Sequence, residues 1–167
     1  ARLRGDQRGM GNFLRWYSNL LINKGLLDQA LSVADRAAAL LLRENDELGV
    51  AKACVEQGHC LFYLDRWPQA LRAFDTALAR LPEQAARYRC AALQTAGLCH
   101  QNLGNLEAAL SCINEAYQYR EALSPQHQAK LLWMQAAICA ARGDLAAEET
   151  LLWEALQSLQ QTHYGEA

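Results

Sequence analysis

Residues 50–82 read VAKACVEQGHCLFYLDRWPQALRAFDTALARLP. Apolar residues recur at intervals of three and four along this stretch, a pattern that predicts two amphipathic helices, each with one buried face. Asp65 lies between the two helices, and Pro68 suits the first turn of the second one, where no amide donor is required. Because the connection is short, the two helices are expected to run antiparallel as a hairpin.

The same pattern returns every 39 or 40 residues. The turns fall at Gly25, Asp65, Gly104 and Gly143. A residue five places after each turn is small in three cases and glutamate in the fourth, in the order Ala30, Ala70, Ala109 and Glu148. Seven places further on, all four repeats carry alanine, at Ala37, Ala77, Ala116 and Ala155. Repetition at such a period predicts helix hairpins that stack on their neighbours.

Composition supports an all-α fold. The chain holds 30 Ala and 29 Leu against 10 Val, Ile and Thr together, and the first two favour helices whereas β-branched residues favour strands. We therefore expect a single domain over residues 12–167, an α-solenoid of about four antiparallel helix hairpins. The repeats are expected at residues 12–44, 47–82, 84–122 and 125–162. Residues 1–11 hold three glycines and three arginines and are expected to form a leader, disordered in part.

Residues 50–82 resemble the tetratricopeptide repeat (TPR). Gly58 matches the small residue where the two helices cross, Ala70 and Ala77 match its close-packing positions, Phe74 matches its core aromatic and Pro82 its terminal proline. The resemblance implies a TPR-like superhelix whose inner wall, formed by the first helix of each hairpin, binds a peptide or a helix. The 39–40 residue spacing is longer than the family's usual 34. It is similar to the repeats in signalling regions of large bacterial transcription activators.

Register with that motif implies which side chains would line the inner wall. They are Arg15, Asn19, Asn23, Lys52, Glu56, His59, Phe62, Tyr63, Gln94, Gln101, Asn102, Lys130, Trp133 and Met134. Amide side chains can pair with the backbone of a ligand, and aromatic side chains can anchor it. Val55 and Leu98 share this register, and for them and Phe62 packing against the next repeat is the alternative role.

Chaperone-binding members of the family hold a C-terminal carboxylate in a clamp of basic residues and asparagine. Arg15 and Asn19 fit the first two places of that clamp. Glu56 falls on the third place and would repel a carboxylate, while Ala91 and Thr95 fall on the last two and carry no charge. A clamp of this kind is therefore not expected.

Other classes of function find little support in the sequence. The four histidines have no partner four residues away for metal binding, and no phosphate-binding loop is present, so no catalytic residue, metal or cofactor is expected. The net charge is −2 and the cations are scattered, which disfavours direct contact with nucleic acid. No apolar run reaches the length of a membrane span. Six cysteines without a C-x-x-C pair indicate buried thiols in a reducing compartment, so a cytoplasmic location is expected.

The predicted function is a non-catalytic module that binds a protein or peptide, as the interaction or sensing part of a larger cytoplasmic protein. Two alternatives stay open. One is the effector-binding region of a multidomain bacterial transcriptional regulator, which takes a small molecule or an inhibitor protein. The other is a scaffold that forms homo-oligomers through its end repeats, for which Leu152 and Trp153 would supply an apolar face.

Overall fold

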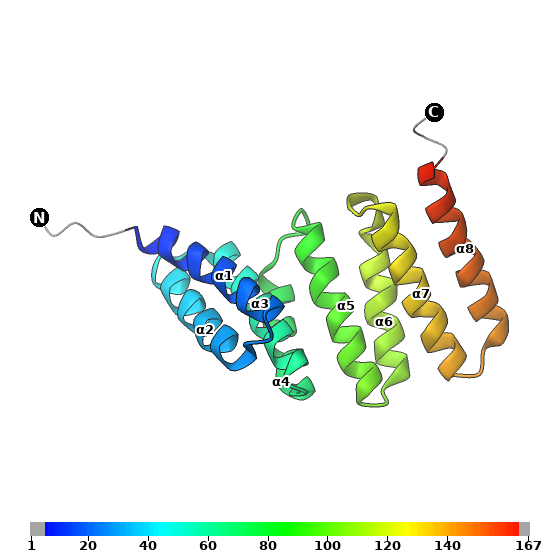
Figure 1. The fold of residues 1–167 in the computed structure, drawn as a ribbon, viewed down its shortest axis with the longest axis horizontal. Helices are drawn as coiled ribbons and strands as arrows, with labels where there is room; N and C mark the ends of the chain where they lie inside the picture. The colour runs from blue at the N-terminus through cyan, green and yellow to red at the C-terminus, as the bar shows by residue number, and fades with distance from the viewer. Residues whose placement is uncertain (1–5, 164–167) are drawn as a thin grey trace, which may run out of the picture. The chain divides into compact units, whose positions relative to one another are not determined.

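The computed structural model describes residues 6–163, and within them it contains helices and no strand (Figure 1). The helices are α1 (Gln7–Asn23), α2 (Leu27–Arg43), α3 (Glu47–Tyr63), α4 (Trp67–Arg80), α5 (Ala86–Asn102), α6 (Leu106–Gln118), the 3-10 turn η1 (Arg120–Ala122), α7 (Pro125–Ala141) and α8 (Leu145–His163). The all-α prediction is confirmed.

Tight turns close the hairpins where the sequence predicts them. Gly25, Gly104 and Gly143 have φ values of 73°, 78° and 81°, and Asp65 has a φ of 56°. This left-handed conformation ends a helix by turning the chain back on itself, and glycine adopts it without steric penalty. The paired helices therefore run antiparallel, as predicted.

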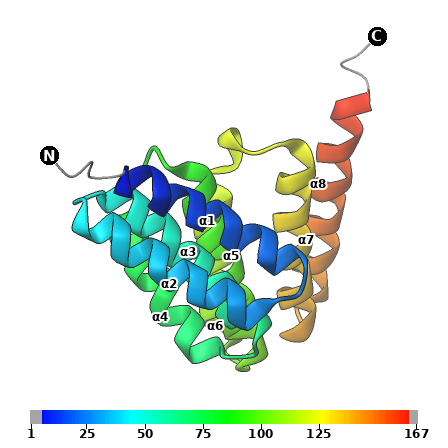
Figure 2. The same ribbon diagram turned by 60° about the vertical axis from the view of Figure 1, so that its left-hand side comes forward.

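The chain divides into two compact units, Ala1–Tyr88 and Arg89–Ala167. In the first unit, α1 pairs with α2 and α3 pairs with α4, while α2 also packs against α3; Figure 2 shows α1 lying beside α2. In the second unit, α7 pairs with α8 and α6 packs against α7. The single domain expected over residues 12–167 stays a prediction.

Small residues sit where the helices of a hairpin cross. A Cβ added to Gly58 of α3 would lie 2.7 Å from Cζ of Phe74 on α4, and one added to Gly97 of α5 would lie 2.7 Å from Cδ1 of Ile113 on α6. In the first hairpin, the Ser18 hydroxyl takes this place and donates a hydrogen bond to the Ala30 carbonyl oxygen at 2.9 Å. The packing register expected from the repeats is therefore confirmed.

The first helix begins earlier than expected. α1 starts at Gln7 rather than near Asn12, and Asp6 caps it by accepting a hydrogen bond from the Gly9 amide at 2.7 Å. Gly11 is buried against the side chain of Leu41, which leaves no room for a Cβ. Residues 7–11 thus belong to the first hairpin and not to a leader. Residues 1–5, where the rest of the expected leader falls, lie outside the described residues.

Candidate functional site

In the first unit, polar side chains of α1 and α3 meet the first turn of α5. Arg15 Nη1 lies 3.4 Å from Glu56 Oε1 and donates a second hydrogen bond of 3.5 Å to the Tyr88 hydroxyl. The Lys52 ammonium lies 4.8 Å from the centroid of the Tyr88 ring, and the Arg15 guanidinium carbon lies 5.8 Å from it. Both cations are thus within range of a cation–π interaction with one ring. We call Arg15, Lys52, Glu56 and Tyr88 the charged cluster.

The charged cluster is largely removed from solvent. The Glu56 side chain is 9% exposed and the Arg15 side chain 15%. Burial disfavours the charged carboxylate and raises the pKa of Glu56 to about 8, although the positive charges of Arg15 and Lys52 oppose the shift. Glu56 Oε2 and Arg15 Nε are both buried and have no hydrogen-bond partner in the protein. Such atoms are uncommon in folded proteins and costly to leave unpaired, so the cluster has hydrogen-bonding capacity that the protein itself does not use.

Glu56 is expected to make the chain less stable as the pH rises from 4.5, its ordinary pKa, to about 8. Between these values the folded state binds more protons than the unfolded state, so the free energy of unfolding falls with rising pH. Above pH 8 the whole cost of a buried carboxylate is present. Urea unfolding across this window, followed by circular dichroism, measures the slope.

The matched comparison uses two substitutions of glutamate by glutamine. Glu56→Gln should flatten the pH dependence in this window, whereas Glu115→Gln, at a carboxylate that is 47% exposed, should keep the wild-type slope. Superimposable pH profiles for wild type and Glu56→Gln would show that the cluster does not hold a protonated carboxyl group.

Other predicted wall residues of the first unit extend from the cluster. Asn19 and Asn23 follow Arg15 at intervals of one helical turn and are exposed, with Asn23 Nδ2 donating to Asn19 Oδ1 at 3.4 Å. On α3, Tyr63 is 57% exposed, and its ring lies 5.3 Å from that of the half-buried Phe62. The His59 ring instead packs edge-on against Phe74, 5.6 Å away.

Together these residues form one polar surface with an aromatic edge on α1 and α3, which are in contact. We call it the α1/α3 surface, made of Arg15, Asn19, Asn23, Lys52, Glu56, Tyr63 and Tyr88. The sequence predicts six of these residues. Tyr88 was missed, because it comes from the next hairpin and no repeated motif position marks it.

The predicted wall residues of the second unit form a separate set. Gln94 and Gln101 of α5 are half-buried, Asn102 is exposed, and Lys130 and Trp133 of α7 are exposed. The prediction for Met134 is wrong. This side chain is 4% exposed, so it packs inside the unit and is unavailable to a partner.

Sequence reasoning also missed an exposed aromatic face on α1. Met10, Phe13, Trp16 and Tyr17 are exposed, and the rings of Phe13 and Tyr17 stack at 6.3 Å between centroids and 8° between planes. The spacing of three, three and one residues places them on one side of the helix, which is the signal that could have found them. We call these four residues the α1 aromatic face.

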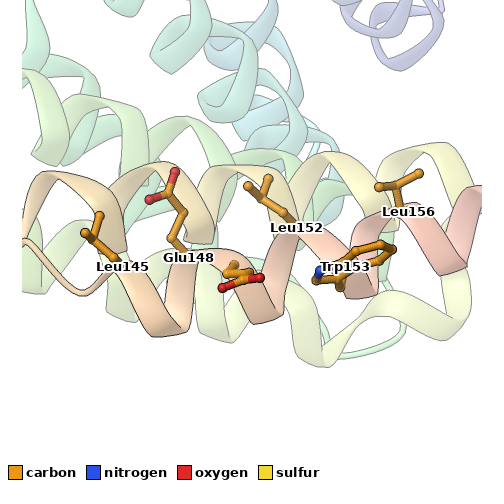
Figure 3. Close-up of a pocket in the computed structure, with 6 residues that line it drawn as sticks. Leu145, Glu148, Leu152, Trp153 and Leu156 are labelled. Carbon is orange, nitrogen blue, oxygen red and sulfur yellow. The ribbon is translucent and has the colours of Figure 1, made fainter.

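On α8, a shallow pocket runs along the outer side of the helix (Figure 3). Its lining combines apolar side chains with two carboxylates: Leu145, Glu148, Glu149, Leu152, Trp153 and Leu156. We call it the α8 pocket. It includes Leu152 and Trp153, the two residues expected to offer an apolar face.

Two further kinds of site were searched for in the part of the chain that the structure describes. Among residues 6–163, no three His, Cys, Asp or Glu side chains are grouped so as to hold a metal ion. None of the described helices is both long enough and apolar enough to pass through a membrane.

Comparison with known proteins connects the chain to solved structures only. No protein-family model matches it, and no curated protein matches it. BtubC from P. vanneervenii has a TM-score of 0.85 at 16% identity over 98% of this chain, and the apo form of RapI has 0.84 at 13% over 96%. MamA has a TM-score of 0.71 at 18% identity over 92% of this chain and 80% of its own.

This chain spans 68% of the length of BtubC and 60% of that of RapI. All three neighbours are TPR-like helical repeat proteins. Identities this low carry the fold and nothing more, so the conclusion is structural: the chain has a TPR-like, all-α fold of antiparallel helix hairpins.

Proposed function

We propose that the chain is a non-catalytic helical repeat module that binds a protein or peptide on the α1/α3 surface. The observation that carries the proposal is the charged cluster, where Glu56 Oε2 and Arg15 Nε are buried without a hydrogen-bond partner in the protein. A fold that needed these groups only for stability would gain by pairing them or by replacing them with apolar side chains. A bound peptide can supply the missing donor and acceptor from its own backbone once the side chains over these two atoms move aside.

The residues around the cluster suit the same kind of ligand. Asn19 and Asn23 present exposed amide groups, which can accept from and donate to the main chain of an extended segment. Tyr63 is an exposed ring at the edge of the surface, and such rings contribute strongly to binding because they bury much area at little entropic cost.

The test starts from a random peptide library displayed on phage and selected against the immobilised chain. An enriched peptide, labelled with fluorescein, is then titrated with wild type and with the double variant Lys52→Ala/Tyr63→Ala. We expect at least about a tenfold increase in Kd, since loss of an aromatic anchor and a charged contact commonly exceeds that effect. Far-ultraviolet circular dichroism should show unchanged helicity.

Trp153→Ala is the matched control, because Trp153 is an equally exposed aromatic residue of α8 that lies outside the α1/α3 surface. Its Kd should stay within about twofold of wild type, well inside 1 kcal/mol. Failure to enrich any peptide, or an equal loss of affinity in the control, would contradict the proposed surface.

The place of the module in a larger protein is the finer part of the proposal. As the sensing region of a cytoplasmic protein, or of a bacterial transcriptional regulator, the α1/α3 surface would take the ligand that controls an adjoining domain. The full open reading frame provides the test. A DNA-binding or nucleotide-binding segment in the same polypeptide supports the regulator, and repeats alone contradict it.

A further inference from the structure

We propose that copies of this chain associate head to tail, with the α1 aromatic face of one copy docked in the α8 pocket of the next. The interface uses residues outside the α1/α3 surface. It therefore goes beyond peptide binding.

The α1 aromatic face is a second apolar side on a helix that already has one. The inner side of α1 buries Leu14, Ser18 and Leu21 in the hairpin with α2, while Phe13 and Trp16 on another side are 55% and 61% exposed. Contiguous exposed apolar side chains of this kind are unusual in monomeric proteins and typically mark an interaction surface.

The α8 pocket is likewise the uncovered side of a packed helix. Ala155 is buried against α7, with Leu151 packed beside it. Leu145 and Trp153 on the outer side are 69% and 61% exposed. Figure 3 shows Leu145, Leu152 and Leu156 spaced along one side of α8, so the pocket can receive a helix along its length.

Charge selects α1 as the occupant. α8 carries Glu148, Glu149 and Glu154 and has no Lys or Arg, whereas α1 carries no acidic residue. The two arginines of α1 already pair with carboxylates of their own chain, Arg8 with Asp46 and Arg15 with Glu56, so the cation that α1 offers to α8 is the lysine at its C-terminal end. Lys24, the exposed C-cap residue of α1, follows Tyr17 by seven residues and so lies on the same side of the helix. Two α8 pockets placed face to face would instead bring four carboxylates together without a cation, which is unfavourable.

The spacing of the charged and apolar residues along α1 also matches that along α8 when the two helices run antiparallel. Seven residues separate Lys24 from Tyr17, and seven separate Glu149 from Leu156, which is about 10 Å along either helix. Docking that places the Lys24 ammonium beside the Glu149 carboxylate therefore places Tyr17, with Phe13 stacked on it, over Leu156. Because the two surfaces differ, the interface is heterologous, and each added copy leaves one face of each kind open.

Two blocked variants test the arrangement. Phe13→Asp/Tyr17→Asp blocks the α1 aromatic face, and Leu152→Asp/Leu156→Asp blocks the α8 pocket. In sedimentation velocity, wild type should increase in mass with concentration beyond a dimer, and each blocked variant alone should stay monomeric. An equimolar mixture of the two should form a one-to-one dimer and nothing larger, since only one productive pair of faces remains.

Other outcomes overturn the proposal. A mixture that stays monomeric excludes the α1–α8 pair, and a variant with a blocked α1 that still dimerises shows contact between two α8 helices. A wild type whose mass does not depend on concentration excludes self-association.

A charge reversal tests the register with milder changes at exposed positions. Lys24→Glu and Glu149→Lys should each weaken association at least about fivefold, as expected for an exposed ion pair turned repulsive. The chain that carries both changes should recover the wild-type strength of association. Two single variants with no effect, or a double variant with no recovery, would rule out the antiparallel register.

Discussion

Ala77→Glu is expected to abolish the stable fold of the first unit. Ala77 is fully buried on α4, at the repeated alanine position where the helices of a hairpin approach closely. A glutamate there must either bury an unpaired carboxylate or push the helices apart, and substitutions of this kind rank among the most destabilising known. We expect a loss of more than about 4 kcal/mol, which is a large part of the roughly 5–15 kcal/mol by which a folded domain is typically stable.

The control lies two residues away on the same helix. Ala79 is exposed, so Ala79→Glu adds the same side chain with the same helix propensity and should change the free energy of unfolding by less than about 0.5 kcal/mol. Thermal and urea unfolding followed by circular dichroism distinguish the two variants. Equal Tm values for them would mean that Ala77 does not lie at a helix crossing.

The contacts within a hairpin explain why the repeats could be recognised from the sequence. Residues of one hairpin that touch, such as Gly58 and Phe74, are close in the sequence, and their spacing follows from the helical period and a short turn. The repeats carry small residues at the same places, apart from Glu148 in the fourth repeat. The antiparallel pairing and the buried alanines depend on these local rules, and both were predicted correctly.

The start of α1 could not be read in this way. Three glycines within residues 5–11 looked like a flexible leader, since glycine is costly inside a helix. In the structure, Gly9 stands beside its capping residue Asp6 and Gly11 stands against Leu41 of α2. Glycine is used there for close approach rather than for flexibility, and only the position of α2 reveals the difference.

The candidate site was predictable only in part, for a related reason. Trp133 and Met134 are adjacent on α7, yet Trp133 is exposed and Met134 is buried, and a register carried over from a motif does not resolve a difference of one residue. Tyr88 joins Lys52 and Arg15 across 36 and 73 positions of sequence. Contacts between hairpins depend on how the hairpins stack, which local periodicity does not specify.

Phe74→Ala is expected to destabilise the first unit by about 3–5 kcal/mol, the usual cost of removing a buried phenylalanine. Phe74 is the largest fully buried side chain among the described residues, and it packs over Gly58 of the preceding helix. Its ring occupies the space that the missing side chain of Gly58 leaves open. Urea unfolding at equilibrium gives the loss directly.

The two positions should therefore be coupled, with a change of sign. In the wild-type background, Gly58→Ala places a Cβ 2.7 Å from Phe74 Cζ, so it should destabilise. In the Phe74→Ala background the ring is absent, and the same substitution should stabilise by up to about 1 kcal/mol, which is the ordinary preference of a helix interior for alanine over glycine. The resulting coupling energy should lie within the range of about 0.5–3 kcal/mol that is typical of residues in contact.

The equivalent pair in the second unit behaves differently and serves as the comparison. A Cβ on Gly97 would meet not only the Ile113 side chain but also the Ala109 carbonyl oxygen, at 3.3 Å. Truncation of Ile113 removes the first obstacle and leaves the second, because a backbone atom cannot move without the helix. The effect of each glycine substitution on the free energy of unfolding should therefore differ. Gly97→Ala should stabilise the Ile113→Ala variant less than Gly58→Ala stabilises the Phe74→Ala variant. Additive effects at both pairs would show that neither glycine is required by its neighbour's side chain.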